Sequence, residues 1–126
     1  MKRTNVPIVF IVENDQDFRI FYAETLINEG VNIIGYAKHG KNSIRMLKSL
    51  LIKPDIIIID LNISLNFGFQ TARDILKFDK NAKIIFINGD ESVKDKAFRV
   101  GAISFLLKSF KYTDLIVEIK HIFNRL

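Results

Sequence analysis

Cysteine is absent from the 126 residues, and proline occurs only twice, at Pro7 and Pro54. A chain without cysteine forms no disulfide, no zinc–thiolate site and no thiol nucleophile, and it suits a reducing cytosol. No apolar run approaches the roughly 20 residues of a membrane-spanning helix, and no signal peptide precedes the first strand-length run. We therefore expect a soluble, cytoplasmic protein that does not associate with membranes.

Glycine is also scarce, with six residues, and none of them completes a phosphate-binding motif. Neither the full G-x-x-x-x-G-K-S/T motif nor G-x-G-x-x-G occurs. The first loop, Glu13-Asn14-Asp15-Gln16-Asp17, is acidic and lacks glycine, so its charge would repel a bare phosphate. These absences count against a P-loop, dinucleotide or flavin site.

The length fits one ordinary domain, and no linker, internal repeat or low-complexity tract divides the chain. We expect a single domain over residues 1–126. Most of the formal net charge of +5 lies from Ser92 onward, where seven basic residues face three acids, and this region is either an ordinary solvated surface or a docking face. Neither a recognition helix nor a run of basic residues interleaved with stacking aromatics is evident beyond Lys111-Tyr112, so direct nucleic-acid binding is not expected.

Five short apolar runs rich in β-branched residues are typical of buried strands. Segments with helical spacing separate them, and the last segment follows the fifth run. Two of these segments have this spacing at Phe18, Phe21, Tyr22, Thr25 and Leu26, and at Ile44, Leu47 and Leu51. Gly30 and Gly101 follow segments of this kind and are predicted helix stops. Such an alternation, without polar positions inside the runs, predicts a doubly wound (βα)5 domain with a five-stranded parallel sheet in the flavodoxin-like order 2-1-3-4-5. The predicted strands are Ile8–Val12, Val31–Ile34, Ile56–Ile59, Ile84–Ile87 and Ile103–Leu107.

Polar side chains follow three of these runs. Glu13 follows the first, Asp60 the third and Lys108 the fifth. Ligands of open α/β sheets bind outside the carboxyl ends of the strands, where these three groups would converge. Mg²⁺ binds through one or two carboxylates plus a phosphate, so the cluster predicts a cation site that helps to load a phosphoryl group onto Asp60.

Each of these residues also has a simpler interpretation. An aspartate at a strand end is more often a helix cap, and a lone lysine is usually solvated; the combination at three strand ends favours a site. We interpret Asp15 and Asp17 as helix-start acids. We expect four phenylalanines to lie in the core: Phe18, Phe21, Phe98 and Phe123.

From about Pro7 to its end, the chain resembles the receiver domain of two-component response regulators. The resemblance rests on Ile11-Val12-Glu13-Asn14-Asp15, on Pro54 to Asn62 around Asp60, and on Gly101-Ala102 through Phe105-Leu106-Leu107-Lys108. It implies that Asp60 accepts a phosphoryl group and that Lys108 pairs with the phosphoryl oxygens. It also implies a Mg²⁺ site formed by Glu13, Asn14, Asp60 and the backbone carbonyl of Asn62.

Three positions depart from the family pattern. Asn14 stands where a second acid is usual, which removes one negative charge from the Mg²⁺ site. Asn88 stands where a switch hydroxyl is usual, with Phe105 as its aromatic switch partner. Ser109 replaces a proline that commonly follows the lysine.

The resemblance implies a signalling module and not an enzyme. It would receive phosphate from a histidine kinase or phosphotransfer protein. It would then act on a downstream protein, or form a homodimer, through the face of the fourth helix, fifth strand and fifth helix. The alternative is a pseudo-receiver that binds its partner independently of phosphorylation.

Overall fold

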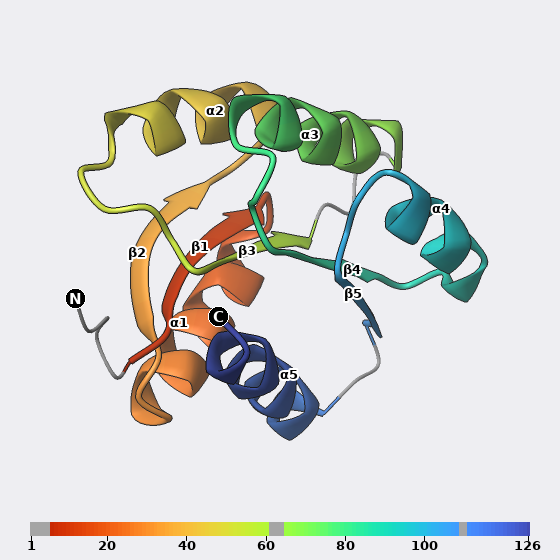
Figure 1. The fold of residues 1–126 in the computed structure, drawn as a ribbon. Coiled ribbons are helices and arrows are strands. Elements are labelled where there is room, and N and C mark those ends of the chain that lie inside the picture. The colour runs from red at the N-terminus through yellow and green to blue at the C-terminus, as the bar shows by residue number, and fades with distance from the viewer. Residues whose placement is uncertain (1–5, 61–64, 109–110) are drawn as a thin grey trace.

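The computed structural model describes residues 6–60, 65–108 and 111–126. They form a parallel sheet in the order β2-β1-β3-β4-β5 (Figure 1). The predicted doubly wound (βα)5 fold and its strand order are therefore confirmed. The strands are β1 (Ile8–Glu13), β2 (Asn32–Ala37), β3 (Ile56–Asp60), β4 (Ile84–Asn88) and β5 (Ser104–Leu107).

Helices cover both faces of this sheet (Figure 1). Residues of α1 and α5 pack in one hydrophobic core, and residues of α2, α3 and α4 pack in the other. Two covered faces explain why the central strands are continuous apolar runs. The helices are α1 (Gln16–Asn28), α2 (Gly40–Ser49), α3 (Leu65–Phe78), α4 (Lys94–Arg99) and α5 (Tyr112–Asn124), with the short 3₁₀ turn η1 (Glu91–Val93) before α4.

The strands β3 and β4 are buried along their whole length. Every residue of β3 and β4 is buried, including the polar residues Asp60 and Asn88 at their carboxyl ends. Side chains of adjacent strand residues point to opposite faces, so the isoleucines of each strand supply both cores. A polar residue that ends such a strand is held in place by the packing beneath it.

Two predicted helix stops are confirmed by their backbone geometry. Gly30 and Gly101 follow α1 and α4 with φ of 80° and 112°. Residues with a Cβ rarely adopt this region, which explains glycine at both positions. After each of these glycines the chain turns back toward the sheet and enters the next strand.

Some details differ from the sequence-based expectations. β2 extends to Ala37 instead of ending at Ile34, because an edge strand tolerates the half-buried Gly35 and Tyr36. Helix α2 ends at Ser49, and Leu51, predicted to lie on its apolar face, is fully exposed. The expectation that Phe21 and Phe98 belong to the core was wrong, since they are 42% and 43% exposed.

Candidate functional site

The register of the sheet brings the predicted site residues together. Glu13 lies directly beside Asp60 at the carboxyl ends of β1 and β3. On the other side of β3, the backbone N–H of Lys108 donates to the carbonyl oxygen of Asn88 at 2.8 Å. The carboxyl ends of four strands therefore surround one crevice, as expected for this topology.

Asp60 is fully buried at the centre of this crevice. The Lys108 ammonium donates to its Oδ1 at 2.8 Å, which confirms the proximity that was predicted for these two side chains. The Tyr22 hydroxyl donates to its Oδ2 at 2.6 Å. Both oxygens of the carboxylate thus accept a hydrogen bond, one from a charged donor and one from a neutral donor.

Glu13 adds a second buried carboxyl group. Its Oε1 accepts the backbone N–H of Asp15 at 3.0 Å. Its Oε2 has no hydrogen-bond partner among the described residues and lies 3.8 Å from the Lys108 nitrogen. Burial, and secondarily the neighbouring Asp60, raise the pKa of Glu13 to about 9. The two adjacent buried carboxyl groups therefore resist being ionised at the same time, and without a metal ion Glu13 tends to hold a proton at neutral pH.

Aromatic side chains of α1 form one wall of the site. The Lys108 nitrogen lies 3.9 Å from the ring centroid of Phe18, a cation–π contact. Tyr22 follows Phe18 by four residues, and its ring lies 5.8 Å from that of Phe21 and 6.4 Å from that of Phe18. The two donors that reach Asp60 are thus both in contact with this helix or part of it.

The sequence-based interpretation assigned Phe18 and Tyr22 to the apolar face of a helix and no more. A signal was present, because a tyrosine hydroxyl at a buried position requires a hydrogen-bond partner. The spacing of four residues also puts both rings on the same face of α1, immediately after the acidic loop.

Helix α1 begins where the sequence indicated. Asp15 is its N-cap, and the side-chain oxygen accepts the backbone N–H groups of Asp17 and Phe18. Asp17 is an exposed acid in the first turn. Both acids therefore have the helix-start positions that we predicted.

Comparison with known proteins agrees with this geometry. The family model of the response regulator receiver domain matches residues 9–120. The chain belongs to the response regulator receiver family. It is 30% identical over 105 residues to the chemotaxis protein CheY of Thermotoga maritima, a match that covers 82% of this chain and 86% of that protein.

Solved receiver structures share the fold. CheY in the CheX–CheY–BeF₃–Mg²⁺ complex of Borrelia burgdorferi has a TM-score of 0.83 at 25% identity, over 93% of this chain and 89% of that one. The response regulator TrrA of Thermotoga maritima, solved with Mg²⁺ and BeF, has a TM-score of 0.80 at 24% identity, over 93% and 99% of the two chains. The family is a signalling family of two-component systems, as predicted.

The donor set of this receiver fits a hard divalent cation. The Glu13 Oε2 atom lacks a hydrogen-bond donor in the described part of the chain and is buried beside a second carboxylate. Mg²⁺ retains several waters, so two carboxylates suffice as its charged ligands. Residues 6–60, 65–108 and 111–126 contain no group of three or more His, Cys, Asp or Glu residues with metal-binding geometry. The predicted ligand Asn14 is half-buried in the same loop, and Asn62 lies outside the described residues.

Asn88 and Phe105, the predicted switch residues, occupy neighbouring strands. The Asn88 amide oxygen accepts the backbone N–H of Asp90 at 2.9 Å, which leaves the NH₂ group as the part of this side chain that could donate to a phosphoryl group. Phe105 lies beside Phe86 in the β4–β5 register and is half-buried against the core under α2, α3 and α4. Their switching roles stay predictions, and Ser109 lies outside the described residues.

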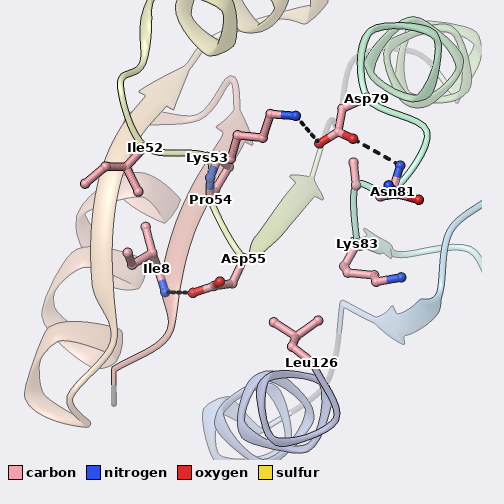
Figure 2. Close-up of a pocket in the computed structure, with 10 residues that line it drawn as sticks. Ile8, Ile52, Lys53, Pro54, Asp55, Asp79, Asn81, Lys83 and Leu126 are labelled. Atoms are coloured by element: carbon pink, nitrogen blue, oxygen red, sulfur yellow. Dashed lines mark hydrogen bonds and ion pairs between the residues drawn. The ribbon is translucent and has the colours of Figure 1, made fainter. Parts of the chain in front are cut away.

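A hollow at the amino ends of the strands is separate from this site. Figure 2 shows Asp55 and Asp79 among its lining residues. The Asp55 carboxylate accepts the backbone N–H of Ile8 at 2.9 Å, and Asp79 accepts that of Asn81 and pairs with Lys53. These acids have structural contacts at the amino ends of the strands, whereas ligands of this fold bind at the carboxyl ends.

The segment Gly35 to Lys41 has the glycine and lysine spacing of a P-loop but is not one. Asn42 stands where that motif has a Ser or Thr that binds Mg²⁺. The strand β2 extends to Ala37 and α2 begins at Gly40, so only two residues separate them. Such a short connection cannot wrap around a phosphate.

None of the helices in the described part of the chain combines the length and the apolar composition needed to span a lipid bilayer.

Proposed function

We propose that this receiver accepts a phosphoryl group on Asp60 from a histidine kinase or phosphotransfer protein and signals through protein contacts. One observation supports this most directly. The carboxylate of Asp60 ends a buried central strand with the Lys108 ammonium at 2.8 Å from its Oδ1. Glu13 lies beside it in the register, so the acceptor, a cation and a second acid are already assembled.

In the proposed reaction, an oxygen of Asp60 attacks the phosphorus of the donor. The new P–O bond forms as the bond to the leaving group breaks, and the leaving group takes the electron pair. The phosphoryl oxygens carry negative charge throughout, and Lys108 can follow them from the carboxylate to compensate it. The product is an aspartyl phosphate, a known type of covalent intermediate.

Glu13, Asp60, Asn14 and the carbonyl of Asn62 would hold Mg²⁺. When bound, the ion supplies positive charge that screens the two carboxylates from the incoming phosphoryl group. Asn14 contributes a neutral oxygen where an aspartate would contribute a charged one, so we expect weaker Mg²⁺ binding than an acid at this position would give.

The output would be a protein–protein contact, so the chain itself would serve as a cytoplasmic signalling module of one domain and not as an enzyme. The face of α4, β5 and α5 supports this proposal. It exposes the large apolar residues Phe98, Ile103, Tyr112 and Val117, interspersed with lysine and arginine. A downstream target or a second copy of the chain could bury them.

The proposal is tested by measuring the intact mass after incubation with acetyl phosphate, with and without Mg²⁺. We expect a Mg²⁺-dependent phosphoryl adduct that is lost in Asp60→Asn. Asp90→Asn is the matched control, because Asp90 is an exposed acid at the same edge of the sheet and Asn also caps a helix. Absence of an adduct on the unaltered protein at high Mg²⁺ would instead favour the pseudo-receiver, which binds its partner without phosphorylation.

A further inference from the structure

The contact between Tyr22 and Asp60 has no part in the proposed transfer described above. Tyr22 belongs to α1, is 1% exposed, and directs its hydroxyl to Asp60 Oδ2 at 2.6 Å. Burial raises the pKa of this phenol above its ordinary value, which is already high, so the hydroxyl keeps its proton at physiological pH. The phenol can therefore donate this hydrogen bond to Asp60 in the unphosphorylated protein.

The two sides of the Asp60 carboxylate differ in access. Oδ1 faces the Lys108 ammonium, whose side chain is partly exposed, with a relative exposure of 15%. Oδ2 faces the hydroxyl of Tyr22, whose side chain is buried and whose ring lies near those of Phe18 and Phe21. A phosphoryl group can be received at Oδ1 if Lys108 follows its oxygens. Oδ2 then becomes the carbonyl oxygen of the acyl phosphate while it still faces Tyr22.

This change weakens the bond to Tyr22. In the unphosphorylated state Oδ2 shares a full negative charge, whereas in the acyl phosphate it is a neutral carbonyl oxygen. Hydrogen bonds to charged acceptors are roughly twice as strong as bonds to neutral ones. The phenol consequently stabilises the free carboxylate more than it stabilises the phosphorylated form.

We propose that Tyr22 is a positioning residue that holds Asp60 in its unphosphorylated form and shortens the lifetime of the phosphoryl group. This rests on the proposed function of Asp60. During hydrolysis a water oxygen attacks phosphorus, the P–Oδ1 bond breaks, and the carboxylate leaves with the electron pair, while the water proton passes to solvent. Charge returns to the carboxylate in the transition state, where the phenol stabilises it.

The test compares Tyr22→Phe with Tyr36→Phe. Each variant loses one hydroxyl and retains its ring, and Tyr36 lies in the edge strand β2, which β1 separates from the strand of Asp60. After loading with acetyl phosphate and Mg²⁺ and removal of the donor, decay of the adduct is followed by intact mass. We expect a lifetime roughly three- to tenfold longer in Tyr22→Phe, from the difference between charged and neutral hydrogen bonds. Tyr36→Phe should decay like the unaltered protein.

An unchanged or shorter lifetime in Tyr22→Phe would overturn the proposal. If the unaltered protein takes no adduct but Tyr22→Phe does, the proposal is supported, because the hydroxyl alone then prevents loading. A structural role would lower the stability of Tyr22→Phe without changing the decay rate.

A second measurement does not depend on phosphorylation, so it separates failure of this inference from failure of the proposed function. Asp60→Asn replaces the charged oxygen by a neutral carbonyl oxygen, as the acyl phosphate does. Urea unfolding of both single variants and the double variant gives the coupling between the two positions. Tyr22→Phe should lose more stability with Asp60 present than with Asn at that position. Equal losses would overturn the inference even if neither protein can be phosphorylated.

Discussion

Glu13 has an unfavourable environment in the metal-free protein. Its carboxyl group is buried beside Asp60, and one of its oxygens lacks a hydrogen-bond donor among the described residues. Burial and the adjacent carboxyl group raise its pKa to about 9. Without a metal ion this arrangement reduces stability, because a buried carboxyl group either stays ionised beside a like charge or takes up a proton.

We therefore expect Glu13→Gln to stabilise the metal-free protein, by about 1–3 kcal/mol. Gln retains the oxygen that accepts the Asp15 N–H and adds an NH₂ donor beside Asp60. Urea unfolding at pH 7 with a chelator measures the difference. Glu24→Gln, on the exposed surface of α1, serves as control and should change stability by less than about 0.5 kcal/mol. Lower stability of Glu13→Gln would contradict the unfavourable pairing.

At the residue scale, the sequence indicated the site residues that follow strands, but it did not indicate Tyr22, which reaches the site from a helix. Glu13, Asp60 and Lys108 follow apolar runs, and parallel strands bring such positions to one edge. Tyr22 has no such marker, because its hydroxyl reaches a residue 38 positions away. The way in which α1 packs against the sheet brings the Tyr22 hydroxyl to Asp60, and the local sequence does not determine this packing.

Helix α1 links the acidic loop to the aromatic wall of the site. Its N-cap Asp15 accepts the N–H groups of Asp17 and Phe18, so the cap orients the turn that contacts Lys108. We expect Asp15→Ala to reduce stability by about 1 kcal/mol in urea unfolding. Asp15→Asn retains a capping oxygen and should lose much less. Equal losses in the two variants would show that the carboxylate charge matters more than the cap.

Elements differ in how well their sequences predict them. The isoleucine runs of β3 and β4 are buried on both faces, so their pattern marks their ends to within a residue. Helix α1 has apolar residues all around, among them the exposed Ile20, Phe21 and Ile27. Spacing alone could not indicate its buried face. The edge strand β2 has a neighbouring strand on one side only, and its predicted limits therefore differ from the observed ones.

The whole molecule should become more stable when Mg²⁺ binds, since a ligand that binds only the native state shifts the folding equilibrium. At 100 times the dissociation constant the gain is about 2.7 kcal/mol. Calorimetric melting points at increasing Mg²⁺ concentrations measure it. We expect a larger rise for Asn14→Asp at equal Mg²⁺, because a carboxylate replaces an amide. A rise identical to that of the unaltered protein would contradict Asn14 as a ligand.

The topology of the whole molecule could be predicted because alternating strands and helices leave few arrangements for a sheet covered on both faces. Two hydrophobic cores, one on each face, realise this arrangement. Five strands wound in this way bring Glu13 and Asp60 side by side without further information. How individual side chains pair within the crevice depends on packing, which composition and spacing do not determine.

The hydrogen bond between Tyr22 and Asp60 has a consequence for how such a protein can evolve. Tyrosine and phenylalanine differ by one oxygen atom, so a single substitution at position 22 would leave the aromatic packing of α1 in place. Under the proposed role of the phenol, that substitution would alter how long the protein stays phosphorylated after a stimulus, while its partners and fold stay the same. Signal duration could thus be tuned from within the core, independently of the surfaces that determine specificity.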